Sequence, residues 1–153
     1  YYFDSKEAIL VELIRTRVGL ALESLLDITA SDATPTEKMR RAVTTHLRVF
    51  HEHADLYTIF NSERLHLISR EAASVVDDLG RQYEQAWAKM VAETGPRSDL
   101  DIPVTVKAIM GMLNTTLVWY DPTGRLTVDE LADQYAELTL HAIDATSGTG
   151  SPG

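Results

Sequence analysis

The apolar residues of this chain return every three to four positions along most of its length, the spacing that lines one side of an α-helix. No segment shows the strict alternation of a half-buried strand. Start and stop signals divide the pattern, and the predicted helices cover residues 5–29, 34–54, 55–61, 69–94, 101–120 and 127–145. The pattern therefore predicts an all-α domain of about six helices, followed by a flexible tail over residues 146–153, which are mostly Gly, Ser and Thr.

Several of these helices begin at residues that commonly cap a helix. Thr34 is followed by Glu37, and Thr127 is followed by Glu130. Both pairs have the spacing of a capping box, in which each side chain bonds the other residue's backbone N–H. Asp101 is the expected cap of the helix between them. These signals place the helix starts independently of the apolar pattern.

The last two long helices carry more apolar surface than one domain can cover. Residues 101–120 are apolar on nearly every side, and residues 127–145 show two apolar stripes. Pairing with a second copy would bury the surplus in an intersubunit four-helix bundle. The residues expected at that homodimer interface are Met112, Leu117, Leu131, Tyr135, Leu138 and Ala142. The alternative is a larger monomer in which a segment preceding Tyr1 covers this face.

Composition narrows the class of protein. A chain of 153 residues with 44% hydrophobic residues is expected to form one globular domain. The net charge is −9, so these residues alone are expected to bind nucleic acid poorly. There is no cysteine, no run of about 18 apolar residues and no signal-peptide pattern. We expect a cytoplasmic protein that does not enter a membrane.

Few side chains have the spacing of catalytic or metal sites. Glu63 and His66 match half of a di-iron motif, which needs a second copy and two more carboxylates. His51 and His53 lack the spacing of a zinc-binding helix, and no third ligand joins His46 and His53. We expect no metal, no cofactor and no enzymatic activity.

Two segments resemble a known family. Residues 1–7, YYFDSKE, resemble the junction in TetR-type (TetR/AcrR) transcriptional regulators where the recognition helix ends and the fourth helix opens. Residues 119–127, WYDPTGRLT, and the chain that continues to Ile143 resemble the last helix–turn–helix of that family. The resemblance implies that residues 1–4 end a recognition helix whose helix-turn-helix is missing upstream. Residues 5–145 would then form the ligand-binding and dimerisation domain.

The resemblance also implies contacts with DNA. The aromatic residues that end the recognition helix and the lysine that opens the next helix touch phosphates in such regulators. The corresponding residues here are Tyr1, Tyr2 and Lys6, which would position the protein without reading bases. The alternative is that the two tyrosines only pack the domains together and Lys6 is solvated.

A central effector site is expected in such a domain. Large or polarizable side chains on inward faces could line it: His46, Phe50, Tyr57, Phe60, Tyr83, Trp87, Met110 and Asn114. His46 and Asn114 are the candidate polar anchors. The same residues could equally form a plain core. Lys107 is the only basic residue of its helix, a poor match to the phosphates of an acyl-CoA, so a free hydrophobic or aromatic effector is as plausible.

The resulting hypothesis is a ligand-responsive regulator, a repressor in the simplest case. A lipophilic effector, lipid-derived, sterol-derived or an acyl-CoA, would move the first helix and release double-stranded operator DNA. The alternative is a helical dimerisation module with a solid core and no small-molecule effector.

Overall fold

The structure, a computed structural model, describes residues 6–55, 57 and 70–145. Within these ranges the chain is helical, without any β-strand, which confirms the all-α prediction. The helices are α1 (Lys6–Ala30), α2 (Pro35–Glu52), α4 (Arg70–Glu93), α5 (Ile102–Trp119) and α6 (Val128–Ile143). The short helix expected over residues 55–61 and the tail over residues 146–153 fall largely or wholly outside the described residues.

The predicted caps start their helices. Thr34 accepts a hydrogen bond from the backbone of Glu37 at 3.2 Å, and Asp101 accepts one from Val104 at 2.9 Å. At Thr127 the full capping box with Glu130 forms. At Thr34 the box stays half-formed, because the carboxylate of Glu37 accepts from Arg41 at 3.0 Å. Side-chain capping supplies partners for backbone N–H groups that the first turn leaves without one.

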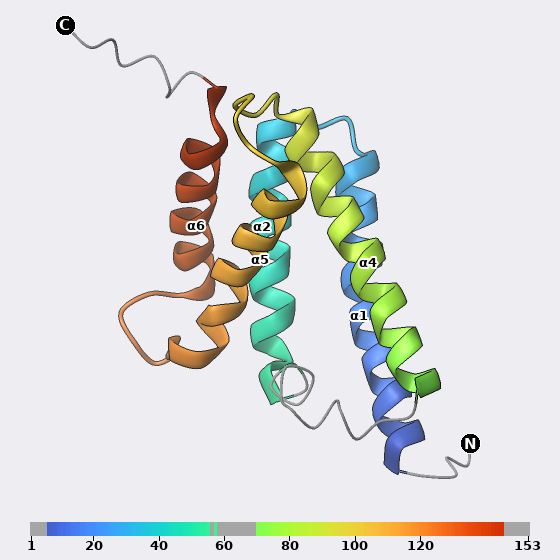
Figure 1. Ribbon diagram of the computed structural model, residues 1–153. Coiled ribbons are helices and arrows are strands. Elements are labelled where there is room, and N and C mark those ends of the chain that lie inside the picture. Colours follow the sequence, from blue (N-terminus) through green and yellow to red (C-terminus); the bar gives the residue numbers. More distant parts are fainter. Residues whose placement is uncertain (1–5, 56, 58–69, 146–153) are drawn as a thin grey trace, which may run out of the picture.

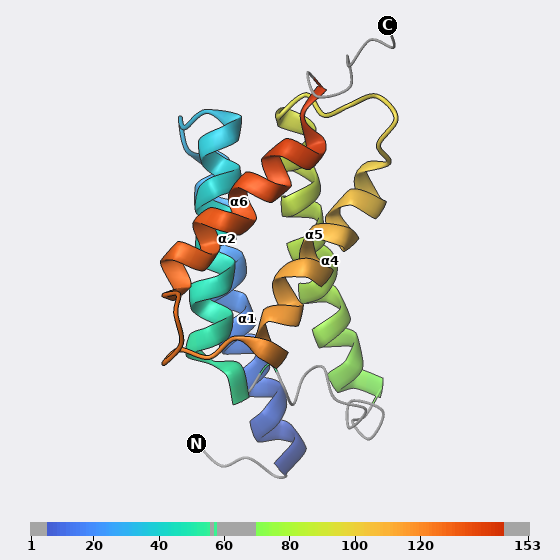
Figure 2. The same ribbon diagram turned by 90° about the vertical axis from the view of Figure 1, so that its left-hand side faces the viewer.

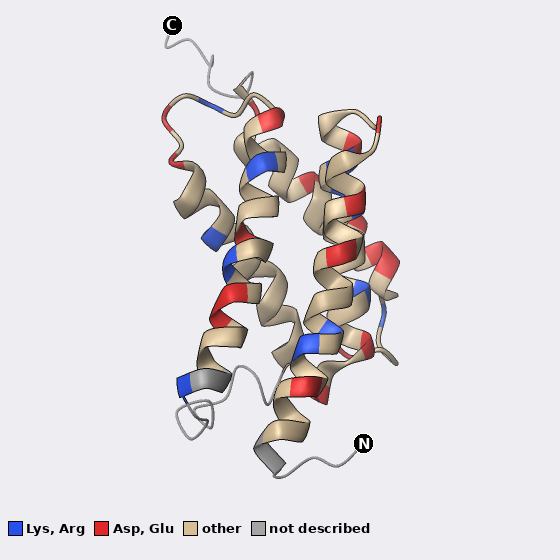
Figure 3. Ribbon diagram, turned by 90° about the vertical axis from the view of Figure 1, so that its right-hand side faces the viewer, with Lys and Arg blue, Asp and Glu red and all other residues tan. Residues whose placement is uncertain are grey.

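Helix α2 lies at the centre and packs against α1, α4, α5 and α6 (Figure 1). Helices α1 and α4 run side by side, and α5 and α6 form the opposite side of the molecule. Helix α6 crosses α2 obliquely (Figure 2). The outer face of α1 and α4 carries acidic and basic residues interspersed (Figure 3). A helix with neighbours all round must be apolar or locally satisfied on most sides, and α2 buries both apolar side chains and His46.

The buried side chains form two clusters. The larger is built around Trp87, which has no exposed surface. The smaller consists of Ile14, Val18, Phe50, Tyr57 and Val76. Since the two clusters meet along α1, α2 and α4, any imperfection in packing between them falls at the centre of the bundle.

The end of α4 is set by a glycine. Gly95 has a φ of 65°, a left-handed conformation in which a side chain would be strained. The chain then turns so that the backbone N–H of Arg97 donates to the carbonyl of Ile143 at 3.0 Å. This bond joins the α4–α5 connection to the last turn of α6.

Candidate functional site

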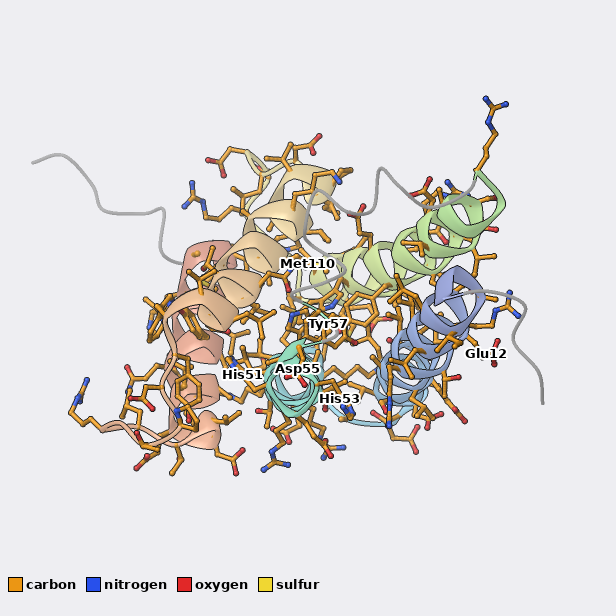
Figure 4. All side chains as sticks on the ribbon, turned by 90° about the horizontal axis from the view of Figure 1, so that it is seen from below. Glu12, His51, His53, Asp55, Tyr57 and Met110 are labelled. Carbon is orange, nitrogen blue, oxygen red and sulfur yellow. The ribbon has the colours of Figure 1, made fainter. Side chains whose placement is uncertain are left out.

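A cavity of about 210 Å³ lies between α1, α2, α4 and α5, where the two core clusters meet. Its walls are Val18, Ala21, Phe50, Tyr57, Gly80, Tyr83, Glu84, Met110 and Asn114. Figure 4, which views the bundle from below, shows Tyr57 and Met110 close together near its middle. A mostly apolar hollow with a few polar groups is the usual form of a small-molecule site.

Three polar side chains from different helices join at one end of this cavity. His46 of α2 contacts the hydroxyl of Tyr83 through Nδ1 at 2.8 Å and Asn114 Oδ1 through Nε2 at 2.9 Å. An amide oxygen can only accept, so Nε2 must carry the proton. Nδ1 is then an acceptor, and the Tyr83 hydroxyl donates to it. The directions of both hydrogen bonds therefore follow from the orientation of the Asn114 amide.

Burial keeps this group of side chains uncharged. Desolvation lowers the pKa of His46 from 6.5 to about 4, against the opposing effect of its bond to Asn114. Burial also raises the pKa of Tyr83 well above its ordinary value. Both shifts follow from the cost of placing a charge in a low-dielectric interior. At neutral pH the polar end of the cavity consists of neutral donors and acceptors.

Stacked rings form one wall. The ring centroids of His46 and Phe50 are 3.9 Å apart, and those of Phe50 and Tyr57 are 3.7 Å apart, with the planes nearly parallel. Trp87 meets His46 edge-on from the other side, at 6.2 Å. Aromatic packing of this kind holds ring orientations more tightly than aliphatic packing does, so the shape of the wall is well defined.

The rim of the cavity carries an ion pair. Glu84 lines the cavity and accepts from Lys107 Nζ at 3.1 and 3.2 Å. Both side chains are largely exposed, so the pair is screened by water. Because Glu84 already matches the lysine charge, Lys107 is not free to pair with an anion.

Most of the predicted effector residues meet at this cavity. Phe50, Tyr57, Tyr83, Met110 and Asn114 line it. His46 stands behind Tyr83 and Asn114 and orients them, and Trp87 lies deeper in the core. Phe60 lies outside the described residues.

Sequence reasoning missed Val18, Ala21, Gly80 and Glu84. Gly80 could have been noticed from the sequence. An isolated glycine inside a helix lowers the stability of the helix and often has a packing or functional reason. A methyl group built on Gly80 would have no atom within 4 Å. The residues of α1 gave no signal, since they read as ordinary core positions.

A second hollow lies on the outer side of α5 and α6. It has a volume of about 300 Å³ and is lined by Leu100, Val104, Thr105, Ala108, Ile109, Met112, Leu138, Thr139, Ala142 and Ile143. We call it the α5–α6 groove. Val104 and Leu138, which are 65% and 59% exposed, extend the apolar lining of the groove to the surface, and a contiguous exposed apolar patch often marks an interface.

The predicted interface residues divide between this groove and the core. Met112, Leu138 and Ala142 line the groove. Leu131 is only 4% exposed and Leu117 packs against the smaller core cluster. Tyr135 packs partly buried against the larger cluster. Of these last three side chains, Leu131 is buried, whereas Leu117 and Tyr135 are partly exposed.

The predicted DNA contacts cannot be placed in the same way. Tyr1 and Tyr2 lie outside the described residues, and of Lys6 only its position at the start of α1 is described. In the described part of the chain, no group of three or more His, Cys, Asp or Glu side chains is arranged to hold a metal ion.

Comparison with known proteins places the chain among regulators. Residues 32–143 match the family model described as "Tetracyclin repressor-like, C-terminal domain". The HTH-type transcriptional repressor KstR2 of Mycobacterium tuberculosis is 26% identical over 147 residues, which are 94% of this chain and 74% of the repressor. Its solved structure, titled a ketosteroid transcriptional regulator, superimposes with a TM-score of 0.81 over 92% of this chain and 74% of that one.

Two further structures share the fold. A TetR/AcrR-family regulator from Thermobifida fusca is 31% identical, with a TM-score of 0.79 over 92% of this chain and 75% of that one. AibR, solved with isovaleryl coenzyme A and operator DNA, is 19% identical, with a TM-score of 0.74 over 89% of this chain and 75% of that one. The curated relatives are transcriptional repressors, which are not enzymes. By the match of its residues 32–143, this chain belongs to the TetR family of transcriptional regulators, as their C-terminal domain.

Proposed function

We propose that this chain is the effector-binding and dimerisation part of a ligand-responsive repressor, which acts in the cytoplasm, and that its effector binds in the cavity between α1, α2, α4 and α5. The observation that carries this proposal is the cavity itself, an apolar hollow of about 210 Å³ that ends in Tyr83 and Asn114. Gly80, a partly buried glycine in α4, lines this cavity and leaves space in it that a larger side chain would occupy.

The effector acts on α1. Val18 and Ala21 of this helix line the cavity, so a ligand that fills the space presses on it directly. The first turn of α1 contains Lys6, which together with Tyr1 and Tyr2 contacts operator phosphates in this proposal. A shift of α1 changes the distance between the two helix-turn-helix domains of a dimer. Because that distance must match the spacing of the operator half-sites, the DNA is released. The effector can drive this shift only by binding the two positions of α1 with different affinities.

Dimerisation uses the α5–α6 groove. Two copies related by a two-fold axis place the exposed Leu138 of one protomer in the groove of the other. The mean hydropathy of α5, 1.2 over 18 residues, would also suit a membrane span by composition alone. However, α5 packs against α2 and α4, buries Thr105 and Thr116, and carries Lys107. A protein partner therefore explains its apolar outer face better than lipid does.

The test of the effector site is a variant in which the cavity is filled. Gly80→Leu places an alkyl side chain in the hollow, whereas Gly19→Leu makes the same change at a helical glycine that does not line it. We expect apolar aromatic fragments to raise the melting temperature of the wild-type and Gly19→Leu proteins but not of Gly80→Leu. Hydrogen exchange should slow in α1 when the fragment binds. If no fragment stabilises the wild-type protein, or if Gly80→Leu responds equally, the effector site is not this cavity.

The test of the dimer is a charge placed in the groove. Leu138→Asp should convert the dimer to monomer in analytical ultracentrifugation, because the dimer would bury an unpaired carboxylate. Leu26→Asp, at an equally apolar and 49% exposed position of α1, should leave it dimeric. A wild-type monomer, or a Leu138→Asp dimer, would overturn the assignment of the interface.

A further inference from the structure

The cavity contains a hydrogen-bond donor that the protein does not use. Asn114 Oδ1 accepts from His46 Nε2 at 2.9 Å, which leaves the Nδ2 group of the same amide on the cavity side. No described residue accepts a hydrogen bond from this Nδ2. An amide N–H that loses water without gaining an acceptor is costly, so a bound molecule is expected to provide one.

The orientation of this donor is coupled to the proton on His46. Asn114 Oδ1 faces Nε2 at 2.9 Å, so Nε2 carries the proton and the Tyr83 hydroxyl donates to Nδ1 at 2.8 Å. A rotation of the Asn114 amide by half a turn would bring Nδ2 against the Nε2–H group, donor against donor. Turning the amide over would therefore also require His46 to change tautomer and the Tyr83 hydroxyl to change from donor to acceptor.

The residues that line the cavity disfavour an anionic acceptor beside Asn114. The lining residues contain no Lys or Arg, and Glu84 is the only carboxylate among them. Lys107 at the rim already pairs with Glu84. Arg17 of α1 acts electrostatically on Tyr57, another lining residue. A carboxylate or phosphate beside Asn114 would still find no Lys or Arg among the lining residues, which disfavours it.

The size of the cavity limits the ligand further. An apolar cavity of about 150 Å³ accommodates benzene, so a cavity of about 210 Å³ accommodates a single ring with a short substituent. The stacked Phe50 and Tyr57 rings offer a flat wall to that ring.

We propose that the site recognises a neutral, ring-bearing or alkyl carbonyl compound, a ketone, amide, ester or thioester, whose carbonyl oxygen accepts a hydrogen bond from Asn114 Nδ2. This inference rests on the proposed function, since it names the class of effector for the same cavity. Asn114 sets the polarity of the ligand, and His46 is a positioning residue that acts through it.

The experiment uses three probes of the same shape: benzylacetone, a neutral ketone; hydrocinnamate, its carboxylate counterpart; and isopentylbenzene, the hydrocarbon counterpart. Their dissociation constants are measured by calorimetry for the wild-type protein, Asn114→Leu, and Gln82→Leu. Gln82 is exposed on α4, so Gln82→Leu makes a similar amide-to-alkyl change away from the cavity.

We expect hydrocinnamate to bind the wild-type protein at least about tenfold more weakly than benzylacetone. The preference for benzylacetone over isopentylbenzene should fall by about tenfold in Asn114→Leu and stay unchanged in Gln82→Leu. Equal binding of ketone and carboxylate, or an unchanged preference in Asn114→Leu, would overturn this inference while leaving the proposed effector site standing. If none of the probes binds the wild-type protein, both proposals fall.

Discussion

Mild acid should destabilise this protein through His46. The buried ring has a pKa of about 4 in the folded state against 6.5 in the unfolded chain. A lowered pKa means that the unfolded chain binds the proton first as the pH falls, so stability is lost from about pH 6.5 downward. From about pH 7.5 to about pH 5.5 the expected loss from this residue is about 1.3 kcal/mol.

The assay is urea unfolding at both pH values and fixed protein concentration, for the wild-type protein and His46→Gln. The variant loses hydrogen bonds and is less stable at every pH, but it lacks the titrating ring. The wild-type protein should therefore lose about 1.3 kcal/mol more than the variant over this interval. His51, whose partial burial also lowers its pKa, titrates in both proteins and cancels. Equal losses, to within about 0.4 kcal/mol, would refute the claim that His46 is buried and neutral.

Other variants test packing and backbone geometry. Trp87→Ala, at a fully buried ring, should lower the free energy of unfolding by about 3–5 kcal/mol in urea titrations, because the bundle cannot close over the space. Gly95→Ala should lower it by about 1–2 kcal/mol, since Gly95 has a φ of 65°, whereas Gly19→Ala in open space within α1 should raise it by about 0.5–1 kcal/mol; equal effects at the two glycines would contradict the backbone argument. Thr127→Ala, which removes the capping box of α6, should cost about 1 kcal/mol, and Thr127→Ser should restore most of it.

The parts of the fold that could be predicted from sequence are those set by neighbours in the chain. The Thr127–Glu130 box and the Asp101 cap are local chemistry, and both form as expected. It was harder to predict which apolar residues of α6 are buried in the core and which are exposed. Leu131 and Leu138 lie two turns apart on nearly the same side of the helix, yet one is 4% exposed and the other 59%. Because α6 crosses its neighbours obliquely, part of one stripe is covered and part is not, and periodicity contains no information about crossing angles.

In the site, too, some features could be predicted from sequence and others could not. Large aromatic residues at apolar helix positions are recognisable from sequence alone, so Phe50, Tyr57 and Tyr83 could be predicted as site residues without the structure. The partners of His46 stand 37 and 68 residues away in the chain, and no local pattern pairs them. The hollow itself depends on a missing side chain at Gly80, and absent volume is visible only when all the walls are in place.

Helix α5 contributes to both hollows described above: Met110 and Asn114 line the cavity, while Ala108 and Met112 line the α5–α6 groove. A single rigid helix cannot adjust one of these faces without moving the other. If both surfaces are used as proposed, effector affinity and subunit affinity are thermodynamically linked. If effector binding changes the affinity between subunits by some factor, dimerisation must change the affinity for the effector by the same factor. The effector concentration needed for a response would then vary with the concentration of the regulator in the cell.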